Sequence, residues 1–332
     1  MRTRYLPWCA AVFAALAFLP LATENTFVLR IATEALLWIG LAITWDVLGG
    51  YTGRVNFGHG AFFGIGAYAT AILMMQGGWP FFATLPAAAL AAGVVAFAAG
   101  LPTLRLKGAY FAIATWALAR AIQQGALVLD ITGGPDGMRL PPFLNPIFFF
   151  YLFLVLVAGI FFGLWFLLER SPFGMKVKAI REDEEGSMSL GLRPTRIKIQ
   201  AFLLSAAPAG LLGGAYAYWI TFIDPASVLG DLVTDQAVVM AVFGGLGTLI
   251  GPAIGAVLIF AFKTYFWAYL SDYQVLYLII LGVIIALSVV FLPDGLWGAL
   301  TSRFGRRRAG APPASPAKPA EPRTAPPAEE RP

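Results

Sequence analysis

The sequence has few charges, few cysteines and few histidines. Only 12% of its 332 residues are charged, about half of the 25% usual in soluble domains. The single cysteine, Cys9, excludes a disulfide framework, and the single histidine, His59, argues against a histidine-rich metal site. No lysine follows a glycine, and neither a G-x-S-x-G elbow nor an H-E-x-x-H motif occurs. We therefore expect no catalysis by this chain, no Walker A loop and no bound metal.

Hydrophobic residues make up 59% of the chain, and it contains 36 glycines. This composition favours packed membrane helices. Nine apolar stretches approach or exceed the roughly 20 residues that cross a bilayer. They cover residues 5–22, 27–48, 57–75, 81–101, 109–129, 147–168, 200–222, 237–270 and 275–292. The stretch 237–270 is too long for one span and has a glycine- and proline-rich centre at 247–252, so we predict an all-α polytopic membrane protein with about ten crossings.

The basic residues predict the orientation of these crossings. Nineteen of the 23 lysines and arginines fall in segments that ten crossings place on one side, and only Arg139 falls in a loop on the other. This asymmetry puts both termini in the cytoplasm. Residues 1–302 are expected to form the transmembrane domain. Residues 303–332, rich in proline, alanine and basic residues, are expected to form a disordered cytoplasmic tail attracted to the lipid bilayer, with no sign of nucleic-acid binding.

Glycine is concentrated in residues 49–68, where a uniform helix is not expected. Non-helical backbone at membrane depth must be covered by protein or line a watery cavity. Two interpretations stay open. Gly60 and Gly64 can serve close helix packing. Alternatively, Asn56, Phe57, Gly58, His59 and Gly60 also line a substrate pathway, as broken helices do in transporters.

The polar segment 169–199 is the one long charged loop. Within it, residues 179–191 are predicted to form a short amphipathic helix ended by Gly191, with Arg181 and Glu185 as an i,i+4 pair. Glu182 lies in the same charged run. Such a helix is either a solvated surface element or a docking site for a cytoplasmic partner.

Two further features concern the membrane region. Gly247, Gly251 and Gly255 are spaced by four, which favours close helix packing. Arg120 falls in the middle of a predicted span and is predicted to be a buried charge that needs a partner. Asp46 and Glu34 are the candidate partners.

Three segments resemble the permease of branched-chain amino acid ABC transporters of the LivM type. They are GYTGRVNFGHGAFFGIGAY at 50–68, RSPFGMKVKAIREDEEGSMSLGL at 170–192 and VFGGLGTLIGPAIGA at 242–256. The resemblance covers residues 30–295. It implies an ABC importer permease fold in a bacterial inner membrane, paired with a second permease of the LivH type. It also implies two cytoplasmic ATPases, which hold the ATP and Mg²⁺, and a periplasmic binding protein that delivers leucine, isoleucine or valine.

The resemblance also assigns roles within the motifs. Residues 169–199 correspond to the loop that couples permeases to their ATPases, where the pattern is Glu-Ala-Ala-x-x-x-Gly. Glu185 and Gly191 keep that spacing, but both alanines are replaced. Asn56-Phe57 stands where Ser-Leu is common, so urea, short amides or another small polar solute are alternative substrates. A stand-alone secondary transporter or channel, or a structural scaffold, is the alternative of another class.

Overall fold

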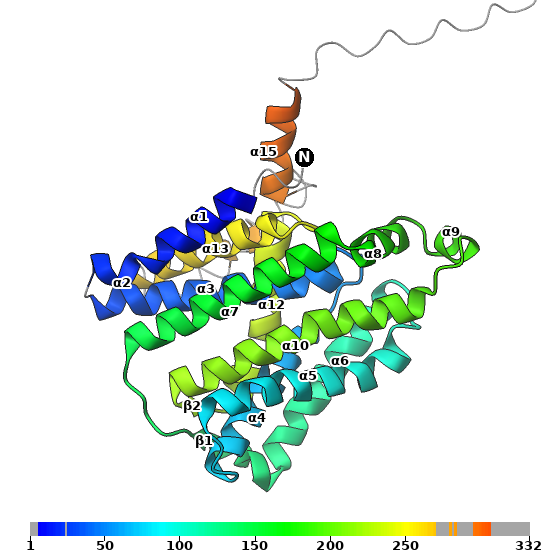
Figure 1. The fold of residues 1–332 in the computed structure, drawn as a ribbon. Coiled ribbons are helices and arrows are strands. Elements are labelled where there is room, and N and C mark those ends of the chain that lie inside the picture. Colours follow the sequence, from blue (N-terminus) through cyan, green and yellow to red (C-terminus); the bar gives the residue numbers. More distant parts are fainter. Residues whose placement is uncertain (1–5, 24, 270–278, 281, 284–294, 307–332) are drawn as a thin grey trace, which may run out of the picture.

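The computed structural model describes residues 6–23, 25–269, 279–280, 282–283 and 295–306 and shows an almost entirely helical chain (Figure 1). The helices are α1 (Leu6–Ala17), α2 (Leu19–Ala22), α3 (Thr26–Gly49), α4 (His59–Met75), α5 (Phe81–Thr103), α6 (Ala109–Val128), α7 (Pro146–Trp165), α8 (Pro172–Glu182), α9 (Glu184–Ser189), α10 (Pro194–Ile220), α11 (Pro225–Leu229), α12 (Asp231–Gly244), α13 (Ile250–Tyr269) and α15 (Gly295–Arg306). The predicted all-helical class is confirmed, with one small exception.

That exception is a pair of two-residue antiparallel strands, β1 (Met138–Arg139) and β2 (Phe222–Ile223). They tie the segment between α6 and α7 to the end of α10. The short helical turns η2 (Asp130–Thr132) and η3 (Gly134–Asp136) precede β1, and a π-helical turn, η4 (Phe166–Arg170), follows α7. The strands lie at one end of the long helices, and α8 and α9 lie at the other (Figure 1).

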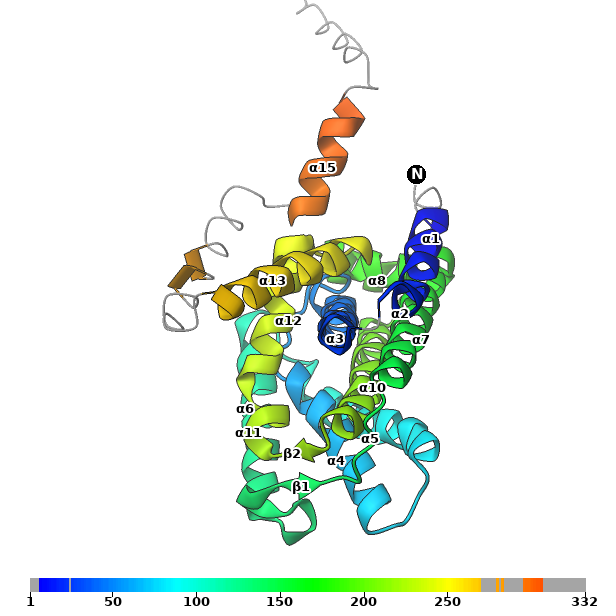
Figure 2. The same cartoon turned by 90° about the vertical axis from the view of Figure 1, so that its left-hand side faces the viewer.

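Helix α3 is the centre of the bundle (Figure 2). It lies between α7 and α10 on one side and α12 and α13 on the other. Every residue from Leu36 to Gly49 except Ile39 is buried, and a helix that is apolar on all sides is expected to be surrounded by protein. The core is therefore built around the second half of α3.

Helices α4 and α10 approach each other most closely through glycine. A Cβ atom on Gly213 of α10 would collide with the backbone carbonyl of Phe63 in α4, and one on Gly66 of α4 would collide with the backbone of Gly210. The absence of side chains lets the two backbones touch, as small residues do between membrane helices.

We therefore expect Gly213→Ala to destabilise the fold by about 1–3 kcal/mol, because the added methyl group must push α4 and α10 apart. Gly159→Ala is the matched control, since a Cβ on this exposed glycine of α7 meets nothing within 4 Å. The control should be neutral or slightly stabilising. Thermal unfolding of the two purified variants measures the difference, and equal unfolding temperatures would contradict the packing argument.

Within the described residues, five helical segments are long and apolar enough to cross a membrane. They are Thr26–Gly49, Phe81–Thr103, Pro146–Arg170, Pro194–Ile220 and Pro225–Gly244. A sixth is obtained if α6 and the turns after it, bent by 87°, count as one span, and three further apolar helices are shorter. The chain is thus a helical polytopic membrane protein. The ten predicted crossings exceed this number, because α1, α4 and α13 are shorter apolar helices and most of the predicted span 275–292 lies outside the described residues.

The predicted division of 237–270 into two helices is confirmed. Helix α12 ends at Gly244 and α13 begins at Ile250, slightly before the predicted turn at 247–252. Gly245 and Gly247 take positive φ values of 122° and 74°, which only glycine adopts readily. Most of the predicted span 275–292 and most of the predicted tail lie outside the described residues, and α15 crosses the predicted boundary at 302/303.

Candidate functional site

The loop between α7 and α10 folds into two short helices, so the prediction of one helix over 179–191 is wrong. Asp183 divides the run, because its backbone is extended (φ −151°, ψ 108°). Its carboxylate accepts hydrogen bonds from the backbone N–H groups of Glu185 and Gly186, both at 3.0 Å, and thus caps α9 at its N-terminus. Arg181 and Glu185, both described, consequently form no ion pair with each other.

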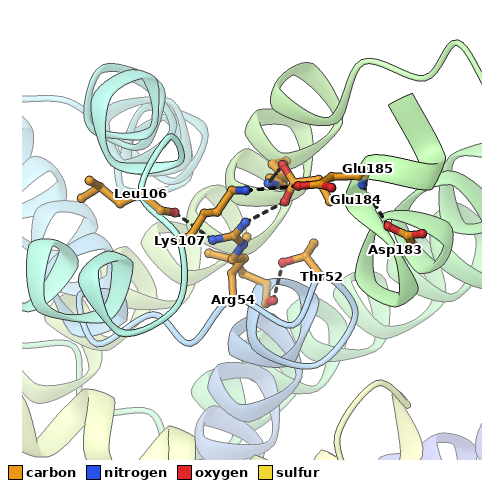
Figure 3. Close-up of polar contacts among 9 residues, drawn as sticks. Thr52, Arg54, Leu106, Lys107, Asp183, Glu184 and Glu185 are labelled. Atoms are coloured by element: carbon orange, nitrogen blue, oxygen red, sulfur yellow. Dashed lines mark hydrogen bonds and ion pairs between the residues drawn. The ribbon is translucent and has the colours of Figure 1, made fainter. Parts of the chain in front are cut away.

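Arg54 fastens α9 to the membrane helices (Figure 3). Its Nη1 donates to the carbonyl of Leu106, in the connection between α5 and α6, at 2.8 Å, and its Nη2 donates to the Glu184 carboxylate at 2.8 Å. Lys198, in the first turns of α10, donates to the other oxygen of Glu184. The side chains of Arg54 and Lys198 are 12% and 2% exposed. The Glu184 carboxylate therefore links α9 directly to Arg54 and to α10, and through Arg54 to the connection between α5 and α6.

The charge state of Glu184 suits this role. Partial burial raises the pKa of its carboxyl group, but the hydrogen bond from Lys198 and the positive charges of Lys198 and Arg54 outweigh burial and hold the pKa below its usual range. A lowered pKa contributes stability that is present above the unfolded-state pKa and lost as pH falls through the folded-state pKa. The anchoring of α9 is thus fully present at neutral pH.

The opposite side of α9 is open. The Glu185 side chain is 81% exposed and only 3.7 Å from the equally open Lys107 ammonium. Met188 and Leu190 are 50% and 83% exposed. Glu182 is exposed as well, and Gly191 ends the segment with φ +82°. We call Glu185, Met188 and Leu190 the α9 surface. It combines uncovered apolar side chains with a charge, as protein interfaces do.

The predicted pathway residues lie inside the chain, just before and at the start of α4. Asn56, Gly58, His59 and Gly60 are buried, and Phe57 is half-buried. The segment is bonded to α3, α6 and α12 through four hydrogen bonds: Trp45 Nε1 to Asn56 O (2.7 Å), His59 Nε2 with Thr44 Oγ1 (3.1 Å), Phe57 N to Thr115 Oγ1 (3.2 Å) and Gly60 N to Thr234 Oγ1 (2.8 Å).

Two polar atoms of this segment lack a partner. Asn56 Nδ2 and His59 Nδ1 form no hydrogen bond within the part of the chain that the structure describes. A buried polar atom left unpaired costs about 1–3 kcal/mol. The bonds of this segment thus fix the backbone and leave side-chain hydrogen-bonding capacity unused.

The glycine turn between α12 and α13 is held by Asp46, near the end of α3. The backbone N–H of Gly247 donates to both carboxylate oxygens of Asp46, at 3.0 and 3.1 Å, and Asp46 is completely buried. The guanidinium of Arg181, from α8, lies directly against Gly247, where a Cβ atom would otherwise stand. Helix α8 therefore contacts the α12–α13 turn through Arg181.

The remaining predicted packing glycines lie at close approaches of the backbone. Gly64 lies against Leu229 of α11, and Gly255 of α13 lies against the carbonyl of Met240 in α12. Gly251 lies against Gly245 in the turn between α12 and α13. A side chain at any of the three would have to displace its neighbour.

Arg120 is not the buried charge that its position predicts. Its side chain is 42% exposed, and it pairs with Asp231 at the start of α12 instead of with Asp46 or Glu34. Nη1 also donates to Gln123 at 2.6 Å. Asp46 holds the glycine turn, whereas Glu34 lies 3.9 Å from Lys263. The sequence shows where a charged residue lies along its helix, but it does not show which residue of another helix becomes its ion-pair partner.

A family model described as "Branched-chain amino acid transport system / permease component" matches residues 27–289. The chain belongs to this family. It is a permease component of a branched-chain amino acid ABC transport system and not an enzyme. The match begins with α3 and includes Asn56–Gly60, α8, α9 and the glycine turn.

Two relatives of the permease carry the LivM name. The high-affinity branched-chain amino acid transport system permease protein LivM of Salmonella typhimurium is 32% identical over 303 residues, covering 80% of this chain and 69% of that protein. LivM of Escherichia coli K12 is also 32% identical, with the same coverage. LivH of Escherichia coli K12 is 26% identical, covering 80% of this chain and 92% of that protein. No solved structure matches the permease.

Sequence reasoning missed three residues that anchor α9 in this permease: Arg54, Glu184 and Lys198. Arg54 could have been singled out, since it is the one basic residue of the predicted inner segment 49–56. Its partner Glu184 lies 130 positions away. Only the fold brings the two together.

Proposed function

We propose that this permease and a second permease of the LivH type together form an importer for leucine, isoleucine and valine in a bacterial inner membrane. Two cytoplasmic ATPases bind ATP and Mg²⁺ and drive it, and a periplasmic binding protein delivers the amino acid. The family match across residues 27–289 supports this assembly. In it, residues 1–302 cross the membrane about ten times, with both termini and the basic tail in the cytoplasm.

The α9 surface is the observation that carries the proposal. It lies at the end of the bundle opposite β1 and β2 (Figure 1), and exposes Met188 and Leu190 beside Glu185. An ATPase bound there pushes on α8 and α9 as it changes shape. Arg181 passes the movement to Gly247, and Arg54 passes it to the segment before Asn56.

The segment Asn56–Gly60 is the proposed gate of the pathway. It is fixed to α3, α6 and α12 by hydrogen bonds, so a movement of any of these helices displaces it. The unpaired Asn56 Nδ2 and His59 Nδ1 then have a water molecule or a solute within reach. In alternating access, displacement of this gate opens the pathway first to one side of the membrane and then to the other.

Urea or short amides are the alternative substrates, because Asn56-Phe57 departs from the usual Ser-Leu. A stand-alone secondary transporter or channel is the alternative class. It leaves the α9 surface without a role, and the family match argues against it.

Reconstitution in liposomes tests the function. The permease is co-purified with the second permease and the ATPases encoded beside it, and uptake of labelled leucine is measured with the binding protein outside and ATP inside. We expect uptake only with all components, and competition by isoleucine and valine but not by urea. Uptake by the permease alone, without ATP, would instead establish the secondary transporter.

Leu190→Asp tests the docking surface. The charge should weaken retention of the ATPases about tenfold, or 1.4 kcal/mol, because it enters an apolar contact without a partner. Leu144→Asp is the matched control, since this leucine is 90% exposed in the segment between β1 and α7, away from α9. The ATPase that co-purifies with each tagged variant is quantified, and Glu185→Ala is measured beside them. Equal retention by Leu190→Asp and Leu144→Asp would sink the docking claim.

A further inference from the structure

A cavity of about 220 Å³ lies between α3, α4, α10 and α12, toward the end of the bundle that carries β1 and β2. Two more cavities, of about 300 and 350 Å³, adjoin it on the sides of α7 and α13. Arg30 lines all three. For comparison, an engineered protein cavity of about 150 Å³ binds benzene. The space at the meeting point is therefore large enough for a small organic solute.

Arg30, in the second turn of α3, is an exposed cation at this meeting point. It forms no hydrogen bond or ion pair with any residue that the structure describes. A guanidinium carries five N–H donors in a planar fork that fits a carboxylate with two parallel hydrogen bonds. A solute that enters the cavity can reach this exposed guanidinium. Its complementary ligand is an anion, and a carboxylate suits its geometry.

Glu34 lies one turn further along α3 and lines the same cavity. Its carboxylate accepts a long hydrogen bond from Trp38 Nε1 at 3.4 Å and lies 3.9 Å from the Lys263 ammonium. These contacts leave lone pairs of the carboxylate unused, since an ionised carboxylate offers about four acceptor sites. Arg30 and Glu34 therefore present opposite charges about 6 Å apart along the helix axis.

The rest of the cavity wall is mostly apolar, with Ser227 and Gln236 as polar members. It is formed chiefly by aromatic and aliphatic side chains from three helices: Leu37, Trp38, Leu41, Phe63, Tyr216 and Trp219. An aliphatic side chain loses water contact favourably in such surroundings, at about 25 cal/mol per Å² of apolar surface removed from water. A solute with two opposite charges at one end and an aliphatic group at the other matches both parts of the cavity.

From this juxtaposition we infer that the cavity is a binding site for a free aliphatic α-amino acid, with Arg30 on its carboxylate and Glu34 on its ammonium group. The inference rests on the proposed function and adds the place where the permease first holds its substrate. A solute without both charges, such as urea, leaves at least one of these side chains unpaired.

The cavity wall includes residues that neighbour the contacts of the proposed gate. Phe63 and Leu41 line it, and each stands close to a gate contact on its own helix. His59 lies one turn before Phe63 on α4, and the carbonyl of Leu41 accepts from Thr44 Oγ1, the same hydroxyl that bonds His59. Val233, also in the wall, is adjacent to Thr234, which binds the backbone of Gly60. A bound amino acid therefore lies directly before the segment Asn56–Gly60.

Photolabelling tests the site in the purified full-length permease. A leucine analogue with a side-chain diazirine is irradiated with the protein in nanodiscs, and labelled peptides are identified by mass spectrometry. We expect labels in residues 30–41 and 216–236. Leucine should compete, whereas isovalerate, which lacks the ammonium, and isoamylamine, which lacks the carboxylate, should compete at least tenfold less, because each leaves one charge unpaired.

Arg30→Gln should lower the leucine-competed labelling about tenfold or more, the effect of losing a charge-assisted hydrogen bond. Arg139→Gln is the matched control, because this exposed arginine at the same end of the bundle contacts Phe222 and does not line the cavity. Competition by the two charge-deleted analogues on the unaltered protein gives a readout that a folding defect cannot affect.

The outcomes separate the two claims. If the complete transporter takes up leucine but labelling is absent, occurs elsewhere, or is unchanged in Arg30→Gln, the site is wrong and the function stands. If the complete transporter takes up no branched-chain amino acid and no label is displaced by leucine, the proposed function itself is wrong. Labelling of the cavity wall that leucine displaces, and that Arg30→Gln but not Arg139→Gln loses, establishes the site.

Discussion

Arg54→Ala should reduce ATP-driven uptake at least thirtyfold while the membrane helices stay folded. The substitution removes two charge-assisted hydrogen bonds, to Leu106 O and to the Glu184 carboxylate, each 2.8 Å long. Such bonds contribute about 1.5–3 kcal/mol each, and the Arg54 side chain is only 12% exposed, so solvent does not replace them fully. Glu184 then keeps Lys198 as its partner but loses Arg54, so α9 no longer transmits a movement of the ATPase to the segment before Asn56. Uptake in liposomes and thermal unfolding measure the two parts of this result.

Lys107→Ala is the control for this variant. Lys107 belongs to the same polar cluster (Figure 3), but it lies 3.7 Å from Glu185 and both side chains are more than three quarters exposed. A surface pair of this kind contributes about 0–1 kcal/mol, so uptake should hardly change. Arg54→Lys should stay impaired, because one ammonium cannot span Leu106 and Glu184 as the guanidinium fork does. Full uptake by Arg54→Ala would show that α9 does not need this anchor.

The helical segments could be predicted from the sequence because membrane helices are set by local properties. The apolar stretch 27–48 corresponds to α3 (Thr26–Gly49), and the stretch 81–101 corresponds to α5 (Phe81–Thr103). Length and hydropathy alone determine such helices. The glycine turn after α12 was also visible, since Gly244, Gly245 and Gly247 interrupt the apolar run.

The contacts of the candidate site could not be predicted in the same way. Arg54 and Glu184 are 130 positions apart, and Arg120 and Asp231 are 111 apart. Hydropathy says nothing about which helices become neighbours. The division at Asp183 was locally readable, because aspartate is a preferred N-cap. The amphipathic pattern, the i,i+4 spacing of Arg181 and Glu185, and the terminal Gly191 favoured one helix and hid that signal.

The second large effect is expected at the turn that Arg181 contacts. Gly247→Ala should abolish coupled uptake, because two costs coincide there. Its φ of 74° costs a non-glycine residue about 1–2 kcal/mol, and the new methyl group would collide with the Arg181 guanidinium. The methyl group displaces this guanidinium, the end of an exposed side chain, and so removes the contact between α8 and the α12–α13 turn. We expect the assembled complex to keep its basal ATP hydrolysis and to lose leucine uptake, and both rates are measured on the same liposomes.

Gly78→Ala separates the two costs. Gly78, between α4 and α5, has a comparable φ of 64°, but a Cβ atom there meets nothing within 4 Å. Both variants therefore bear a similar backbone penalty, and only Gly247→Ala disturbs Arg181. If uptake falls equally in both, backbone strain rather than the α8 contact explains the loss. Asp46→Asn adds a test without strain: it keeps the size of the side chain but leaves one oxygen in place of the two that accept from Gly247 N–H at 3.0 and 3.1 Å. If α8 acts through this turn, Asp46→Asn must weaken uptake more than it weakens thermal stability.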